Sequence, residues 1–174
     1  MKMTMKAWLV PVLAVAAVCW GTTLAAQDQE EEGNPAAAAK AALSARVSLD
    51  RGLAASASHG RPISAKFEVD EGKSQLSVYT MKGGKFFEVS IDPASGRVSK
   101  TEAIADGEDY TAAQSQSAAM AKAKVSLRAA VQNALRANAG FRAVSVTPSL
   151  KDGRAVAEVA LAKGEELKTV SVPL

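Results

Sequence analysis

Apolar and polar residues alternate strictly in the middle of the chain. Ile63, Ala65 and Phe67 are apolar, whereas Lys66 and Glu68 lie between and after them. A period of two is typical of a β-strand that buries one face. Similar alternating or β-rich patterns return in five later segments, at 76–80, 87–91, 143–150, 155–162 and 167–172. The pattern therefore predicts two groups of at least three strands each.

Turn-forming residues separate these segments. Glu71-Gly72-Lys73 follows the first strand, and Lys82-Gly83-Gly84 is typical of a β-hairpin. Asp92-Pro93 ends the third strand, and Ala94-Ser95-Gly96 predicts another turn, after which Arg97-Val98 begins a short return strand. Connections this short indicate antiparallel meanders.

A helix is predicted before each group of strands. Ser126 is a suitable N-cap, and an apolar stripe follows it, made of Leu127, Ala130, Val131, Ala134 and Leu135. Gly140 lies where that helix should end. The earlier helix is capped by Ser48, carries Leu49, Leu53 and Ala57 at spacings of four, and stops at His59-Gly60-Arg61-Pro62.

Short motifs recur in the same order in both regions. Val47-Ser48-Leu49 returns 78 residues later as Val125-Ser126-Leu127. Three further pairs are 81 residues apart: Asp70-Glu71-Gly72-Lys73 with Lys151-Asp152-Gly153-Arg154, Lys82-Gly83 with Lys163-Gly164, and Val89-Ser90-Ile91 with Val170-Ser171-Val172. One insertion in a loop explains the change of spacing, so the pattern indicates a duplicated unit.

The predicted fold class is α+β, with two repeated units that each pack one helix on a three- to four-stranded antiparallel meander. The units are expected at 46–100 and 121–174, with a linker at 101–120. The acidic and Ala-rich segment 27–45 is expected to be a solvated leader followed by a loosely held helix at 36–45. Each unit is small, so the two are expected to support each other.

The N-terminus predicts a signal peptide over residues 1–26. Lys2 and Lys6 precede an apolar run at 8–18, and small residues follow up to Ala25 and Ala26. The run is shorter than the roughly 20 residues of a spanning helix, so we expect no stable membrane insertion after cleavage. An uncleaved N-terminal anchor is the alternative. The expected location is periplasmic or secreted.

Removal of the signal changes the composition. The basic residues fall from 21 to 19, against 18 acidic residues, so the mature chain is close to neutral and nucleic acid is not an expected partner. The single cysteine, Cys19, lies within the signal. Disulfides and thiol chemistry are therefore excluded from the mature protein.

The end of the first unit resembles the PepSY domain. A Val-Ser-Leu-begun helix, a Lys-Gly hairpin and the closing residues Ile91-Asp92-Pro93-Ala94-Ser95-Gly96-Arg97-Val98 carry the resemblance, with Ser95 where threonine is more usual. The second copy stops at Leu174 before this turn and is interpreted as a truncated or divergent repeat. PepSY domains occur in exported bacterial proteins and in propeptides of secreted metalloproteases. The resemblance implies a binding module that inhibits or regulates extracytoplasmic proteases.

No catalytic or metal-binding pattern is found in the sequence, so we expect no enzyme activity, no cofactor and no metal. His59 is the single histidine, and zinc sites need several nitrogen or sulfur ligands. Asp106, Glu108 and Asp109 lack the spacing of a calcium loop and are interpreted as solvated.

Two classes of function stay open. The first is a protein-binding module whose partner is a protease or another envelope protein, bound through a sheet face or edge. Tyr79 and Phe86 are its candidate partner contacts, because Phe86 is expected on the sheet face opposite Phe87, Val89 and Ile91. The alternative is that the second unit or the segment 36–45 covers Phe86. The second class is an envelope structural or sensor domain that binds a small ligand or a cell-wall component.

Overall fold

The computed structural model describes residues 34–174, and the predicted signal peptide and residues 27–33 of the leader lie outside this range. The described chain is an α+β fold with one seven-stranded antiparallel sheet. In chain order its elements are α1 (Pro35–Ser44), α2 (Leu49–Ala55), the 3₁₀ helix η1 (Ser56–His59), β1 (Arg61–Asp70), β2 (Lys73–Lys82), β3 (Lys85–Ile91), β4 (Val98–Ile104), α3 (Gly107–Lys122), α4 (Leu127–Ala137), β5 (Arg142–Lys151), β6 (Arg154–Lys163) and β7 (Glu166–Pro173). Every strand predicted from alternation is confirmed, and so are both helices. Ser126 caps α4 as predicted, whereas the Ser48 side chain makes no capping hydrogen bond to α2.

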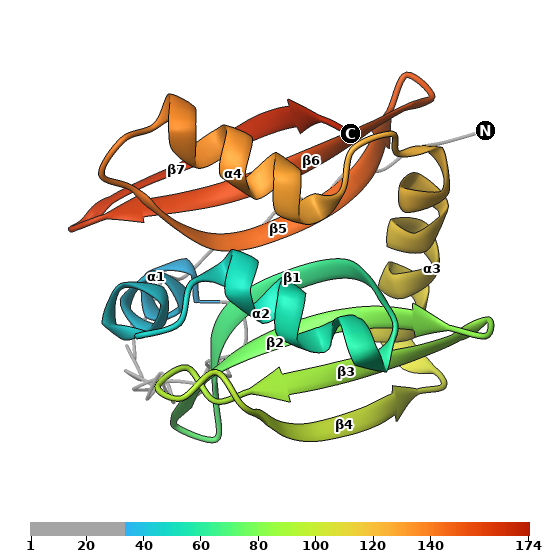
Figure 1. The fold of residues 1–174 in the computed structure, drawn as a ribbon, viewed down its shortest axis with the longest axis horizontal. Helices are drawn as coiled ribbons and strands as arrows, with labels where there is room; N and C mark the ends of the chain where they lie inside the picture. Colours follow the sequence, from blue (N-terminus) through green and yellow to red (C-terminus); the bar gives the residue numbers. More distant parts are fainter. Residues whose placement is uncertain (1–33) are drawn as a thin grey trace, which may run out of the picture.

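The strands follow the order β4-β3-β2-β1-β5-β6-β7. Neighbouring strands along the chain form long ladders, whereas β1 and β5 pair through two positions alone, Ala65 with Val146 and Lys66 with Ser145. The predicted meanders therefore join edge to edge in one sheet. Beyond this short junction β1 and β5 spread apart, as Figure 1 shows.

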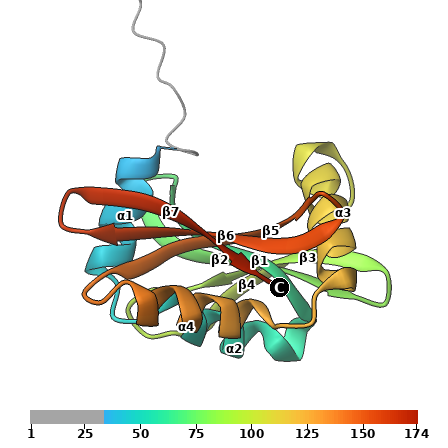
Figure 2. The ribbon, with the colours of Figure 1, turned by 90° about the horizontal axis from the view of Figure 1, so that it is seen from above.

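Helices α2 and α4 lie side by side on one face of the sheet (Figure 2). The main core lies beneath them, where Phe67, Leu76, Val89, Val146 and Val159 are almost completely buried. The stripe of α4 that the sequence predicts contributes to this core through its buried residues Leu127, Ala130, Val131 and Ala134. Alternation and helical periodicity therefore assign this face correctly.

Helices α1 and α3 lie at opposite ends of the β1–β5 junction (Figures 1 and 2). The expectation of a loosely held helix at 36–45 is wrong, because Ala39, Ala41 and Ala42 of α1 are buried, with 4%, 3% and 0% of their surface exposed. Alanine side chains are small, so the α1 backbone can approach the spreading strands closely. Asn34 caps this helix by accepting hydrogen bonds from the amides of Ala36 and Ala37.

The predicted linker at 101–120 consists mostly of regular secondary structure. Its first residues extend β4, which pairs along β3, and the rest form most of α3. Ala113, Ala119 and Met120 are the buried residues of α3, and the Arg61 guanidinium donates a hydrogen bond to the Met120 carbonyl. This segment is thus part of the folded body, on the sheet face opposite α2 and α4 (Figure 2).

The hairpins that begin each half share two local features. The register of β1 against β2 shifts between Pro62 and Ser64, and the register of β5 against β6 shifts between Ala143 and Ser145. The turns that follow are also alike, since Glu71-Gly72 and Asp152-Gly153 have positive φ at both residues. Positive φ at both central positions is the geometry of a tight two-residue hairpin.

The closing turn of the first half anchors the start of α2. Ser95 donates to the Asp92 carboxylate from its backbone amide and from its hydroxyl, both at 2.6 Å. The Pro93 carbonyl accepts from the amides of Arg46 and Val47, at 3.0 and 3.1 Å. The residues that carry the family resemblance therefore have a structural role here, joining the β3–β4 turn to the chain before α2.

Candidate functional site

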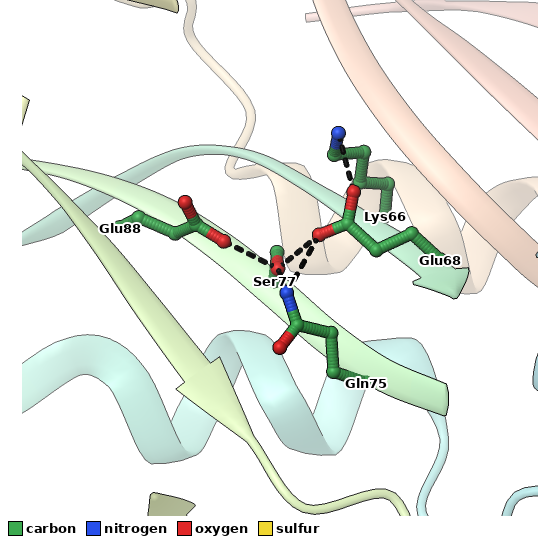
Figure 3. Close-up of polar contacts among 5 residues, drawn as sticks. All are labelled: Lys66, Glu68, Gln75, Ser77 and Glu88. Atoms are coloured by element: carbon green, nitrogen blue, oxygen red, sulfur yellow. Dashed lines mark hydrogen bonds and ion pairs between the residues drawn. The ribbon is translucent and has the colours of Figure 1, made fainter. Parts of the chain in front are cut away.

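Polar side chains gather on the α3 side of the first half of the sheet (Figure 3). The residues Lys66 and Glu68 of β1, Gln75 and Ser77 of β2, and Glu88 of β3 form this group, called here the Ser77 cluster. The strand register brings them together, because Glu68 lies opposite Gln75 and Lys66 lies opposite Ser77. Alternation thus places apolar residues under α2 and α4 and polar residues on the reverse face.

Ser77 is the centre of the cluster and is completely buried. Its hydroxyl lies 2.6 Å from Oε1 of Glu88 and also bonds Oε1 of Glu68. Nε2 of Gln75 donates to the same hydroxyl at 3.0 Å and to Glu68 at 3.1 Å. Nζ of Lys66 lies 2.5 Å from the other oxygen of Glu68. Glu68 is 6% exposed, and the Lys66 ammonium balances its negative charge inside the cluster.

A cavity of about 240 Å³ opens beside the cluster. It is lined mainly by polar side chains, and Lys100 and Glu102 of β4, Asp109 of α3 and Tyr79 of β2 contribute to it. Carboxylates outnumber ammonium groups around this cavity. The surroundings of the half-buried Glu88 are therefore unfavourable to a second negative charge beside Glu68.

The protonation equilibria of the cluster reflect this environment. Burial raises the pKa of Glu88, and the charges of Glu68 and Asp109 act in the same direction, whereas the Ser77 hydrogen bond and Lys66 oppose the shift. Burial by itself would lower the pKa of Lys66, but the hydrogen bond and charge of Glu68 outweigh it, so that pKa is raised. The cluster thus stabilises the charged form of Lys66 and the neutral form of Glu88 relative to their ordinary equilibria.

The geometry does not support nucleophilic catalysis at Ser77. An activated serine needs a neighbouring base that can take its proton and an open path to substrate. Ser77 is completely buried between carboxyl groups, and His59 lies elsewhere, with its Nδ1 3.3 Å from the Thr101 hydroxyl. Within residues 34–174 no group of three or more His, Cys, Asp or Glu side chains is arranged to hold a metal ion.

Tyr79 and Phe86 lie on the cluster side of the sheet, as the alternation predicts, but their exposure differs from the expectation. They are 9% and 7% exposed, and the Phe86 ring meets Tyr110 of α3 edge to face, with 5.6 Å between ring centres. Helix α3 covers Phe86, rather than the second unit or segment 36–45. An exposed patch made of these two rings is therefore ruled out, because the predicted linker is a helix that lies over them.

The exposed edges of the sheet offer a second candidate site. Strands β4 and β7 are the outermost strands, and each pairs on one side alone among the described residues. On β4, Lys100 and Glu102 form an exposed ion pair of 2.7 Å. On β7 the residues from Thr169 to Pro173 are uncharged, and Leu167 is 45% exposed. Charged side chains protect an edge against strand addition, so β7 is the more receptive edge.

A larger cavity, of about 590 Å³, lies next to this receptive edge. Leu167 and Thr169 of β7, Leu161 of β6, Val144 of β5 and Pro35 of α1 are among the residues that line it. Apolar side chains supply much of its wall. The first half of β7 is therefore bordered by a hollow surface that can receive further apolar side chains.

Comparison with known proteins assigns no family. No family model matches the chain, and no curated protein matches it. A solved structure of a candidate lipoprotein from Clostridium difficile 630 is similar over 64% of this chain and 74% of its own, with 13% identity and a TM-score of 0.37. At this distance the similarity carries no argument about fold or function.

None of the helices between residues 34 and 174 combines the length and the apolar character that a membrane span requires.

Proposed function

We propose that this protein is exported and acts as a non-catalytic module that binds an extended segment of another extracytoplasmic protein along β7. The basic and apolar N-terminus supports export. The observation that carries the binding proposal is the outer edge of β7, which no strand within residues 34–174 pairs. This edge is uncharged from Thr169 onward and bordered by the exposed side chain of Leu167.

The two halves of the chain are, in this proposal, copies of one helix-plus-meander unit. The register shifts in β1 and β5, the matching turns after them and the symmetric order of strands around the β1–β5 junction support duplication. These features are spaced by 81 residues, as are three of the four sequence motifs. Such agreement between motif spacing and backbone geometry is what a duplicated unit requires.

Duplication makes β3 and β7 counterparts, and their outer edges differ. β3 is covered by the antiparallel strand β4 from Phe86 to Ile91, whereas no described strand covers β7. A strand supplied by a partner would take the position beside β7 that β4 takes beside β3. Its backbone would satisfy the free amides and carbonyls of β7, and apolar side chains would contact Leu167.

The resemblance to PepSY domains supports a protein partner, with an extracytoplasmic protease as the first class to test. An extended segment of such an enzyme, rich in β-branched and apolar residues, fits the uncharged part of β7 from Thr169 onward. Binding of this kind requires no catalytic group in the module itself.

Charged variants of β7 test the proposal. Thr169→Lys with Ser171→Lys places two exposed charges on the edge, and Ala103→Lys on the exposed strand β4 is the matched control. With partner recovered from an envelope extract, we expect the double variant to bind at least about tenfold more weakly, a change of about 1.4 kcal/mol. Hydrogen exchange at 166–173 should slow in the complex. Equal binding by the double variant, or unchanged exchange at β7, would contradict the proposed surface.

A small-ligand function is the second candidate, and the cavity of about 590 Å³ favours it. A sensor or structural domain of the envelope could bind a cell-wall fragment there. Thermal shifts of the mature protein with soluble cell-wall fragments distinguish the two. A shift that Leu161→Trp abolishes, together with unchanged hydrogen exchange at β7 in envelope extract, would favour the ligand function.

A further inference from the structure

The hydrogen bonds of the Ser77 cluster need one proton more than the side chains supply when both glutamates are ionised. A serine hydroxyl has a single hydrogen to donate. Here that hydroxyl faces two carboxyl oxygens, one from Glu68 and one from Glu88, while Gln75 uses it as an acceptor (Figure 3). An ionised carboxylate accepts hydrogen bonds and donates none. One of the two carboxyl groups must therefore carry a proton and donate it to Ser77.

The remaining contacts assign this proton to Glu88. Glu68 pairs with the Lys66 ammonium at 2.5 Å and accepts from Gln75 at 3.1 Å, so its negative charge is compensated. Glu88, by contrast, is hydrogen-bonded to Ser77, and no cation within residues 34–174 forms an ion pair with it. The favourable arrangement has Ser77 donating to Glu68 and the Glu88 carboxyl donating to Ser77.

We propose that Glu88 is a proton-binding site, and that its protonated carboxyl acts as an acid-dependent latch between the sheet and α3. The inference is independent of the proposed function at β7. It rests on the three-way contact at Ser77 and on the position of Glu88 beneath α3, which meets the same sheet face through Tyr110 against Phe86 and through Gln116, bonded to the Ser64 hydroxyl.

The groups around Glu88 determine what happens when the proton leaves. The titratable and charged groups that face it are Lys66, Glu68 and Asp70 of β1, Tyr79 of β2, Lys100 and Glu102 of β4, and Asp109 of α3. Lys66 and Lys100 are already paired, with Glu68 and Glu102. Ionised Glu88 thus adds a negative charge close to those of Glu68 and Asp109. Repulsion from Asp109 acts across the contact between α3 and the sheet and weakens it.

The direction of the effect follows from linkage. A carboxyl that binds its proton more tightly in the folded state than in the unfolded state favours folding below its unfolded pKa. This contribution is lost as pH rises through the pKa of the folded state. Glu88 has a raised pKa, mainly through burial, so the latch is closed in acid and loosens as the solution becomes less acidic.

Carbon-13 NMR of the side-chain carboxyl groups, recorded from pH 3 to pH 8 on protein without its signal, tests the assignment directly. We expect Glu88 to titrate above the ordinary glutamate range of about 4.3. A Glu88 midpoint at or below the ordinary range would overturn the proposal.

Urea unfolding at a series of pH values tests the latch. Glu88→Gln replaces the protonated carboxyl with an amide that can donate to Ser77 at every pH. Wild type should lose stability relative to this variant as pH rises through the Glu88 midpoint, whereas Glu102→Gln, on the same cavity but exposed, should follow wild type. The same pH dependence of stability in Glu88→Gln and wild type would contradict the latch. The NMR titration of wild type tests the proton site even if a variant fails to fold.

Discussion

At the scale of single residues, the sheet faces follow from alternation, but burial depends on what covers each face. Phe86 and Phe87 point to opposite faces as expected. The sequence favours Phe87 as the core residue, because it shares a face with Val89 and Ile91. In the structure Phe87 is half-buried, near the end of that face, whereas Phe86 is buried under Tyr110. A strand pattern contains no information about which helix lies on its polar side.

Phe86→Ala should therefore lower the free energy of unfolding by about 3 kcal/mol, the usual cost of removing a buried phenylalanine ring. The half-buried Phe87→Ala is the matched control and should lower it less. Urea unfolding at constant pH measures both values. A loss below about 1 kcal/mol for Phe86→Ala would contradict the packing of α3 on this face.

Asp92 has the opposite pH behaviour from Glu88. Hydrogen bonds from the Ser95 hydroxyl and amide hold the pKa of its carboxyl below the ordinary value. A lowered pKa gives stability that is present above the unfolded value of about 3.9 and is lost as pH falls through the folded value. Asp92→Ala should thus lower the urea midpoint at pH 7, and the difference from wild type should shrink at about pH 2. A difference independent of pH would contradict the role of the ionised carboxylate.

At the scale of elements, strands were predictable and α3 was not. Alternation and paired turns define the hairpins, since each strand predicted from alternation has one apolar face. Helix α3 has only three buried residues, Ala113, Ala119 and Met120, which are too few to form an apolar stripe. The acidic residues near its start resemble a solvated loop. The helix-forming residues from 112 to 122 were the one feature of the sequence that favoured a helix here. The packing of α3 depends on residues that are distant in sequence.

Helix α2 packs closely on the sheet at Gly52. Gly52 is buried, and a Cβ there would lie 2.3 Å from Cδ2 of Leu76, a residue with no exposed surface. Alanine favours a helix over glycine by about 1 kcal/mol, but an overpacked core costs typically about 1–3 kcal/mol. We expect Gly52→Ala to lower the thermal midpoint, while Ala54→Gly on the exposed face reports propensity alone. A raised midpoint in Gly52→Ala would contradict the close contact.

At the scale of the whole molecule, the sequence predicts two similar units but not how they join. The junction consists of two residue pairs between β1 and β5, and neither strand has a motif that marks it as an inner edge. Helices α1 and α3 then fill the two ends where the strands spread. The sequence pattern does not predict the Ser77 cluster either. Its residues come from three strands, and alternation alone assigns them to a solvated face.

The central claim is that β7 is the edge that receives a partner strand. Residues 27–174 contain no cysteine, so a cross-linker can be attached at one chosen position. Ser171→Cys places it on β7, and Ala103→Cys places it on β4 as the matched control, both at exposed sites. In envelope extract we predict a discrete cross-linked product from Ser171→Cys, absent from Ala103→Cys, whose joined peptide is an extended segment of the partner. Equal products from both positions, or a product from β4 alone, would contradict the claim.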